Sequence, residues 1–282
     1  MIEILRAGAL TTVQDQGRPG WAHLGVPRSG ALDPAALRLG NRLVGNPEAA
    51  AGLEITLTGC ELRLHCAGTV AVTGAEADVR VDRRPADPGR PLSLPAGAVL
   101  RIGPARHGLR SYLAVSGGIA VEPVLGSRAT DTLSGLGPPP VRDGDRLPIG
   151  PVTGPPAPVD FTAAPAPAAE LRLTLRPGPR DDWFTPVAWH RLLHTAYQVS
   201  PMSDRIGARL LGAPLPRAVA GELPSEPVVL GAVQVPADGQ PLIFLADHPT
   251  TGGYPVVGVV DDVTPLAQAS PGTTVRFHGP QR

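Results

Sequence analysis

Val228-Val-Leu-Gly-Ala-Val-Gln-Val-Pro-Ala-Asp-Gly-Gln-Pro-Leu-Ile-Phe-Leu-Ala246 carries the clearest secondary-structure signal in the chain. It holds two apolar runs, Val228–Val235 and Pro241–Ala246, joined by Pro-Ala-Asp-Gly at 236–239. Apolar runs on either side of a short turn with Asp-Gly are typical of a β-hairpin. We therefore expect two antiparallel strands here.

Short apolar runs of the same kind recur along the rest of the chain. They are separated by turn residues, because 35 prolines and 34 glycines are spread over the 282 residues. This spacing predicts an all-β barrel or sandwich. The further runs are Leu62–Leu64, Thr69–Thr73, Val79–Val81, Leu92–Leu94, Val99–Ile102 and Leu113–Val115.

Two segments have the pattern of helices. The first is 34–43, with Asp33 as the N-cap, Pro34 at the first helical position and Gly45 after its end. The second lies within 183–197. The predicted fold is thus mainly β with a few helices.

A Pro- and Ala-rich segment at 151–169 divides the chain. It has too few large apolar residues to form a core, so we expect an extended linker. This leaves an N-terminal part at 1–150 and a C-terminal part at 170–282, which begins with a strand signal at Leu171–Arg176. Each part has the size of an ordinary domain.

Composition argues against several classes of protein. The formal net charge is zero and aromatic residues make up 4% of the chain, which disfavours nucleic-acid binding. Membrane-spanning runs and a signal-peptide pattern are not seen, so we expect a cytoplasmic protein without a membrane partner. Cys60 and Cys66 alternate onto one face of a predicted strand, where we expect both to be buried free thiols.

All 25 basic residues are arginine. This chain therefore contains no Walker A lysine, Schiff-base lysine or lysine for attached biotin. If ATP or biotin takes part in the chemistry, a partner must carry much of the binding apparatus.

The loop Asp247–Tyr254, after the second hairpin run, is rich in side-chain oxygens and contains Gly252 and Gly253. Successive glycines can direct backbone N–H groups toward an anion or a developing oxyanion. The alternative is a tight turn that needs positive φ at both glycines.

A second polar loop at 11–20 contains Gln14, Asp15 and Arg18. Arginine can bind a carboxylate or phosphate through two parallel hydrogen bonds. The alternative is a surface turn with an Asp–Arg pair that contributes little to stability.

Two further loops in the N-terminal part have two interpretations each. Ser29 precedes the first predicted helix, whose free N–H groups can bind an anion, although capping by Asp33 explains the same residues. Residues 127–137 contain Thr130–Thr132, which are either ligand-binding or structural turn residues.

The segment 201–212 contains Ser203, Arg205 and Arg209. In a helical turn the two arginines would project from one face and form an anion site. Asp204 is the carboxylate that could neutralise one of them.

Two other patterns have simpler explanations. His190 and His194 have the spacing of a helical metal pair but lack the glutamate of a zinc hydrolase, so we expect a solvated helix face. Ser225 and Glu226 could be a nucleophile and a base, or residues at the start of a strand.

Eight motifs occur in one order along nearly the whole chain, and together they resemble the family of 5-oxoprolinase C subunits. This family is also described as allophanate hydrolase subunit 2-like, as biotin-dependent carboxyltransferase, and as the antagonist of the sporulation-kinase inhibitor. The motifs are Thr11-Thr-Val-Gln-Asp15, Ser29-Gly-Ala-Leu-Asp33, Leu53-Glu-Ile-Thr56, Arg110-Ser-Tyr-Leu-Ala-Val-Ser-Gly-Gly-Ile119, Ser127–Gly137, Ser203-Asp-Arg-Ile-Gly-Ala-Arg-Leu-Leu-Gly212, Gly231-Ala-Val-Gln-Val-Pro-Ala-Asp-Gly-Gln-Pro241 and Thr250-Thr-Gly-Gly-Tyr-Pro255.

The resemblance implies two cyclophilin-like β-barrel halves in one chain. It implies one component of an ATP-dependent lactam hydrolase that converts 5-oxo-L-proline to L-glutamate and is active only with B-type and A-type subunits, which share or bind the ATP. Many family members continue into a helical tail, so with the sequence ending at Arg282 we expect the contacts of that tail to be missing.

The resemblance leaves two alternative functions open. One is the carboxyltransferase component of a biotin-dependent urea or amide carboxylase, with biotin on another chain. The other is a regulatory protein that binds and antagonises a B-type kinase inhibitor without turnover.

Site roles are assigned as hypotheses to polar positions inside the matched motifs, and no metal is expected. Arg205 and Arg209 would hold a carboxylate or phosphate, and Glu226 or Asp247 would transfer a proton. Thr250, Thr251, Gly252 and Gly253 would donate to an oxyanion, with the two threonines as catalytic residues, and Gln234 and Gln240 would orient an amide. The remaining residues would contact the substrate: Gln14, Asp15, Arg18, Ser29, Ser203 and Tyr254.

Overall fold

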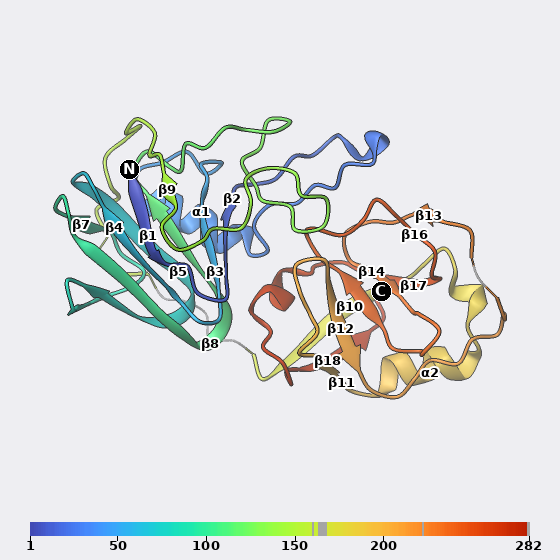
Figure 1. Ribbon diagram of the computed structural model, residues 1–282. Coiled ribbons are helices and arrows are strands. Elements are labelled where there is room, and N and C mark those ends of the chain that lie inside the picture. Colours follow the sequence, from blue (N-terminus) through green and yellow to red (C-terminus); the bar gives the residue numbers. More distant parts are fainter. Residues whose placement is uncertain (160, 163–167, 222, 281–282) are drawn as a thin grey trace. The chain divides into compact units, whose positions relative to one another are not determined.

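A computed structural model describes residues 1–159, 161–162, 168–221 and 223–280 (Figure 1). It divides into an N-terminal unit, Met1–Arg18 with Ser29–Pro167, and a C-terminal unit, Pro19–Arg28 with Ala168–Arg282. The mainly β prediction is confirmed. The short segment Pro19–Arg28 belongs to the C-terminal unit, whereas the expected N-terminal part at 1–150 included it.

The N-terminal unit is built on a nine-stranded sheet with the order β2-β3-β8-β4-β1-β9, in which β5 pairs with β6, β7 and β8. Two predicted pairs of apolar runs merge into the long strands β5 and β8, which are paired along most of their length through several β-bulges. The strands are β1 Ile2–Arg6, β2 Leu10–Gln14, β3 Gly52–Thr56, β4 Cys60–Leu64, β5 Gly68–Val81, β6 Arg84–Ala86, β7 Leu92–Leu94, β8 Val99–Val115 and β9 Arg146–Leu147.

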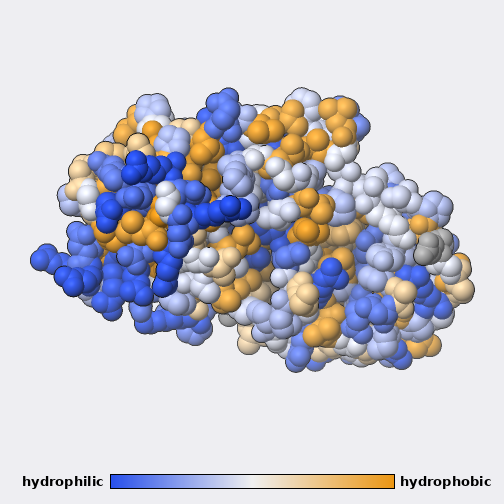
Figure 2. All heavy atoms as spheres, viewed as in Figure 1, coloured by the Kyte–Doolittle hydropathy of each residue, from blue (hydrophilic) through white to orange (hydrophobic). Residues whose placement is uncertain are grey.

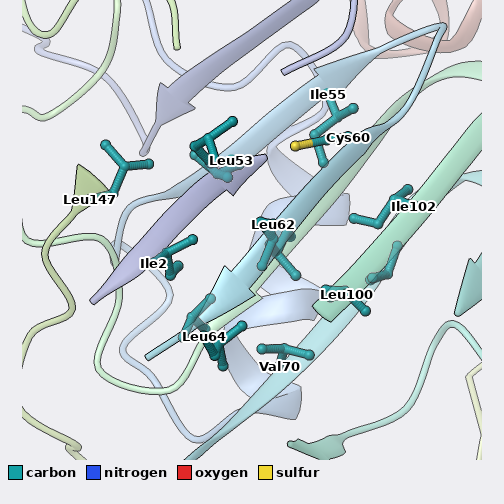
Figure 3. Close-up of a cluster of buried hydrophobic side chains, with 14 of the residues drawn as sticks. Ile2, Leu53, Ile55, Cys60, Leu62, Leu64, Val70, Leu100, Ile102 and Leu147 are labelled. Carbon is teal, nitrogen blue, oxygen red and sulfur yellow. The ribbon is translucent and has the colours of Figure 1, made fainter. Parts of the chain in front are cut away.

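One face of this sheet forms the core of the N-terminal unit. Ile2, Leu62, Leu64 and Leu100 are fully buried and gather with other apolar side chains (Figure 3). Burying each such side chain contributes roughly 1.5–3 kcal/mol. One half of β5 and one half of β8 bear exposed charged side chains, and a hydrophilic area lies at the lower left of this unit in Figure 2.

The two cysteines differ in exposure. Cys60 is buried, and burial raises the pKa of its thiol to about 12. Cys66 is exposed, so the prediction that both are buried is wrong for this residue. The physical reason is that β4 ends at Leu64, and the alternation of faces ends with it.

The predicted first helix is confirmed as α1, Pro34–Leu43, in which the Asp33 side chain accepts a hydrogen bond from Ala36 N at 2.9 Å. The helix packs on the sheet, with the Thr73 hydroxyl donating to Ala36 O at 2.8 Å. Gly45 follows the helix with φ 77°, a left-handed conformation that suits glycine.

The C-terminal unit contains a closed barrel with the order β10-β17-β14-β15-β12-β11-β18, in which β18 closes in parallel onto β10. The predicted hairpin is confirmed, because β14 and β15 pair with Val233 opposite Ile243. Its first strand is shorter than the apolar run. The strands are β10 Glu170–Pro177, β11 Tyr197–Val199, β12 Gly207–Leu211, β14 Ala232–Gln234, β15 Leu242–Phe244, β17 Val256–Val260 and β18 Thr274–His278, with a separate two-stranded sheet of β13 Glu226–Pro227 and β16 Thr251–Gly252.

The second predicted helix is confirmed in a shorter form as α2, Pro186–His194, with the Thr185 side chain capping Ala188 N. Single turns of 3₁₀ helix occur at η1 Ala22–Leu24 and η2 Asp181–Trp183, and a slightly longer one at η3 Thr264–Gln268. Across the part of the chain that the structure describes, no helix has both the length and the apolar character needed to span a membrane.

Part of the expected linker at 151–169 can be described. Thr153 donates its hydroxyl to Gly45 O at 3.0 Å, and Ala157 N donates to Leu43 O at 2.9 Å. This stretch therefore runs along the end of α1 in the N-terminal unit. Residues 160 and 163–167 of the expected linker lie outside the described residues.

Candidate functional site

Three loops that are distant in sequence meet beside β2 in the N-terminal unit. Thr130 N donates to Val13 O at 2.9 Å, and Ala31 N donates to Asp15 O at 3.0 Å. These bonds bring together the segments 14–18, 29–31 and 127–131, which we call the polar loop cluster. Three of the motifs singled out in the sequence thus form one site in space.

Two adjacent carbonyls hold the cluster together. The Arg18 Nη2 donates to Ala129 O. Thr130 O accepts from Gln14 Nε2 at 2.9 Å and from the Ser29 hydroxyl at 3.1 Å. The structure therefore brings together Gln14, Arg18 and Ser29, which sequence analysis predicted separately as binding residues.

Asp15 does not pair with Arg18, so the surface Asp–Arg pair considered from the sequence is wrong. Its Oδ1 accepts from the Ser127 hydroxyl at 2.6 Å and from Gly17 N at 2.8 Å. Its Oδ2 accepts from Arg128 N at 2.6 Å. Through these bonds the Asp15 carboxylate holds the loop in place, and it does not pair with Arg18.

Arg18 is 1% exposed, and its Nε and Nη1 have no hydrogen-bond partner in the described structure. Gln14 Oε1 and Thr130 Oγ1 are also buried without a partner. Four of the eight such atoms in the described residues thus lie in this cluster. A buried charge without a counter-charge is costly, and native proteins satisfy nearly all buried polar groups, so this concentration distinguishes the cluster from the rest of the fold.

The close approach of the loops depends on backbone conformations that most residues avoid. Gly137 has φ 81°, and a Cβ there would overlap Ala129 O and lie 3.1 Å from Arg18 Nη2. Gly30 has φ 98°, and a Cβ there would lie 2.8 Å from Gly17 N. Ser29 has φ 53°, which is unfavourable for a residue other than glycine. Strained positions of this kind gather at binding sites.

A buried ionisable group beneath the cluster was not singled out from the sequence. Glu54 Oε2 accepts from the Tyr112 hydroxyl at 2.8 Å and from Leu32 N at 2.9 Å, and Arg110 Nε lies 3.6 Å from Glu54 Oε1. Burial, followed by the Glu54 charge, raises the pKa of Tyr112 well above its ordinary value. The sequence feature that could have indicated this group is a glutamate inside the apolar strand β3. The Glu54 carboxylate positions the loop before α1.

In the C-terminal unit, Arg205 is neutralised by Asp247. The Arg205 Nε lies 2.9 Å from Asp247 Oδ2, and its Nη2 lies 3.0 Å from Oδ1, with both side chains buried. A bidentate pair of this kind joins the segment before β12 to the segment after β15, and it makes Asp247 a poor choice for transferring protons.

The helical turn considered for Arg205 and Arg209 is not present. Asp204 Oδ1 accepts from Ile206 N and Gly207 N at 2.8 and 2.9 Å, which forms a turn leading into β12. Arg205 is buried and Arg209 is exposed, so they do not share a face. Asp204 engages the backbone and neutralises neither arginine.

The paired glycines do not form the expected anion-binding nest or tight turn. Neither Gly252 nor Gly253 has positive φ, and Gly252 lies in β16 opposite Glu226 of β13. A Cβ at 252 would overlap Gln234 Nε2, so a larger residue there would displace this amide group. The Gln234 Nε2 donates to Tyr254 O at 3.0 Å, and the close packing of Gly252 against Gln234 leaves this amide in position for the hydrogen bond.

Other predicted side chains of the C-terminal unit have structural partners. Glu226 forms a bidentate pair with Arg180, and this hydrogen-bonded guanidinium lowers the pKa of the Glu226 carboxyl. Gln240 bonds both the N–H and the carbonyl of Gly212, at 2.9 and 3.1 Å. The Ser203 hydroxyl accepts from Arg209 N at 3.1 Å. Thr251 and Tyr254 are exposed, and Thr250 is half-buried.

His190 and His194 are exposed on α2 with their ring centroids 4.2 Å apart. Within the described residues, no group of three or more His, Cys, Asp or Glu side chains is arranged to hold a metal ion. The polar loop cluster therefore has the strongest geometric claim to bind a ligand.

Comparison with known proteins identifies relatives along the whole chain. The family model described as carboxyltransferase domain, subdomain A and B, matches residues 24–279. The C subunit of 5-oxoprolinase from Escherichia coli (strain K12) is 40% identical over 285 residues, which cover 98% of this chain and 90% of that protein. The C subunit of 5-oxoprolinase from Haemophilus influenzae is 33% identical, with the same coverage of both chains.

A solved structure is also similar. The crystal structure of the urea amidolyase of K. lactis has a TM-score of 0.90 and 29% sequence identity. The match covers 99% of this chain and 19% of that one, so the similarity is to one part of a longer polypeptide.

Proposed function

Because this chain belongs to the carboxyltransferase domain family with subdomains A and B and is a homologue of the C subunit of 5-oxoprolinase, we propose that it is the C subunit of an ATP-dependent 5-oxoprolinase. The observation that carries the proposal is the 40% identity to the Escherichia coli protein over 98% of this chain. The polar loop cluster supports it as a built site for a small polar ligand. We place the enzyme in the cytoplasm.

The proposed reaction opens the ring of 5-oxo-L-proline with water to yield L-glutamate. A lactam carbonyl is a poor electrophile, and ATP supplies the activation that makes attack by water feasible. This chain cannot contain a Walker A sequence, because it has no lysine. The proposal therefore places ATP on A-type and B-type partner subunits, and this chain contributes substrate binding.

Reconstitution of the enzyme tests this proposal. The chain is combined with the A-type and B-type subunits, and glutamate release from 5-oxo-L-proline is measured with and without ATP, omitting each component in turn. We expect ATP-dependent release that requires all three components. A stable complex with the B-type subunit that releases no glutamate would contradict the proposal and support the regulatory alternative.

The similarity to urea amidolyase supports a second candidate, the carboxyltransferase component of a urea or amide carboxylase. This reaction needs a biotin carrier on another chain, because this chain has no lysine to modify. Carboxyl transfer to urea that requires a biotinylated partner, and that avidin inhibits, would favour this candidate. Glutamate release that is insensitive to avidin would favour the oxoprolinase.

A further inference from the structure

We propose that the polar loop cluster is a carboxylate-binding site in which the Arg18 guanidinium neutralises the carboxylate of a small-molecule ligand. Assigning this carboxylate to 5-oxo-L-proline rests on the proposed function, whereas the anion site itself follows from the structure of the N-terminal unit.

Arg18 is buried and always protonated, yet among the described residues its side chain bonds only the neutral carbonyl of Ala129, through Nη2. Its Nε and Nη1, which together carry three N–H donors, have no partner in the described structure. A negative charge that pairs with a buried guanidinium offsets the cost of burying it. A ligand carboxylate matches the forked arrangement of the guanidinium N–H groups.

The neighbouring carboxylates of the cluster cannot complete it. Asp15 accepts three hydrogen bonds from Gly17 N, Arg128 N and the Ser127 hydroxyl. Asp131 accepts from Leu133 N at 2.9 Å, from Ser134 N at 3.1 Å and from the Ser134 hydroxyl at 2.6 Å. Both side chains hold loop turns, and in the described structure neither forms an ion pair with Arg18. A ligand carboxylate is therefore the counter-charge that we infer.

Neutral groups of the cluster add a second recognition element. The Gln14 Nε2 donates to Thr130 O and to the Thr12 hydroxyl, which fixes the amide with Oε1 as an unpartnered acceptor. An acceptor of this kind suits an N–H donor of the ligand, and Thr130 Oγ1 can donate or accept. A carboxylate together with an amide N–H is the pattern of a cyclic amino-acid amide.

The same features favour a carboxylate over a phosphate. The cluster contains two arginines, of which only Arg18 is buried, because Arg128 is half-buried and donates its Nε to Val121 O at 2.7 Å. The N-terminus of α1 is already capped by the Asp33 carboxylate. Phosphate sites typically add a free helix N-terminus or a glycine-rich nest to the cationic side chain.

Two arginine substitutions form a matched test of stability on the full chain. Arg205→Met removes a buried arginine that Asp247 pairs, so we expect the thermal unfolding midpoint to fall by about 10 °C. Arg18→Met removes a buried arginine that pairs with no carboxylate among the described residues and loses one hydrogen bond to Ala129 O, so we expect a much smaller fall of the midpoint than in Arg205→Met. A fall as large as that of Arg205→Met would show that Arg18 has a structural role and would overturn the proposal.

Ligand binding is then measured as a rise of the unfolding midpoint of the wild-type chain. The probes are 5-oxo-L-proline, 2-pyrrolidinone, sodium acetate and inorganic phosphate at equal ionic strength. We expect saturable rises with 5-oxo-L-proline and, more weakly, acetate, no rise with 2-pyrrolidinone, and loss of both rises in Arg18→Met. Stabilisation by phosphate alone would overturn the carboxylate assignment.

The assembled enzyme supplies a second readout. Losing hydrogen bonds to a charged group should raise KM for 5-oxo-L-proline roughly 10- to 100-fold in Arg18→Met, with partial recovery in Arg18→Lys. An unchanged KM would overturn the inference while leaving the proposed function intact. Acetate binding that depends on Arg18, in a chain whose complex releases no glutamate, would contradict the proposed function and leave the anion site standing.

Discussion

At the scale of single residues, the buried arginines of this chain occupy different electrostatic surroundings. Arg205 lies in a bidentate pair with Asp247, and Arg110 lies 3.6 Å from Glu54. Arg18 contacts a neutral carbonyl. The residue type alone could not distinguish a structural guanidinium from a binding one, because the difference depends on which carboxylate the fold places beside each.

The Arg205–Asp247 pair allows a prediction about stability. Asp247→Leu leaves a buried guanidinium without its carboxylate, so we expect the free energy of unfolding to fall by roughly 3–5 kcal/mol. In the double variant Arg205→Met with Asp247→Leu both charges are absent, and much of this loss should be recovered. Urea denaturation measures both values.

The exposed Arg209 is the matched control for this pair. Arg209→Met should change the free energy of unfolding by less than about 0.5 kcal/mol. A double variant no more stable than Asp247→Leu would show that packing around the pair, rather than the unpaired charge, sets the cost.

At the scale of elements, local signals succeeded where a single segment determines the outcome. The cap at Asp33 and the apolar runs around 236–239 placed α1 and the β14–β15 hairpin correctly. The same signals failed for Gly252 and Gly253, because the conformation of a glycine-rich loop depends on what packs against it. Here the packing partner is Gln234, 18 residues earlier in the chain.

The close packing at Gly252 yields a prediction with a neighbouring control. Gly252→Ala places a Cβ on Gln234 Nε2 and displaces it from Tyr254 O, which should cost about 1–2 kcal/mol in the free energy of unfolding. Gly253→Ala should be nearly neutral, because the nearest atom to its Cβ would be Leu223 O at 3.4 Å. Chemical denaturation of both variants measures the difference.

A double-mutant cycle identifies the source of that cost. In a Gln234→Ala background the three atoms nearest to the new Cβ are absent, so Gly252→Ala should lose most of its effect. If the cost persists in this background, strain within β16 itself must be responsible.

At the scale of the whole molecule, family resemblance and the turn-rich apolar pattern were enough to predict a mainly β chain. The polar loop cluster was beyond the reach of local patterns. Gln14, Arg18 and Ser29 each occupied an ambiguous loop, and their convergence on Ala129 and Thr130 spans more than 100 residues of sequence. The sequence motifs lie in these three loops, but only the hydrogen bonds beside β2 show that the loops form one cluster.

The division into two units predicts separable unfolding. Leu62 lies in the core of the N-terminal unit and Ile243 in the barrel of the C-terminal unit, and both are fully buried. Leu62→Ala and Ile243→Ala should each cost roughly 2–5 kcal/mol through the cavity they leave. Since each unit has its own buried side chains and the size of a domain, scanning calorimetry should show one transition lowered by Leu62→Ala and another by Ile243→Ala.

The exposed substitution Arg209→Met serves as the control and should move neither transition. Equal shifts of every transition by both core variants would show instead that the two units unfold as one cooperative structure.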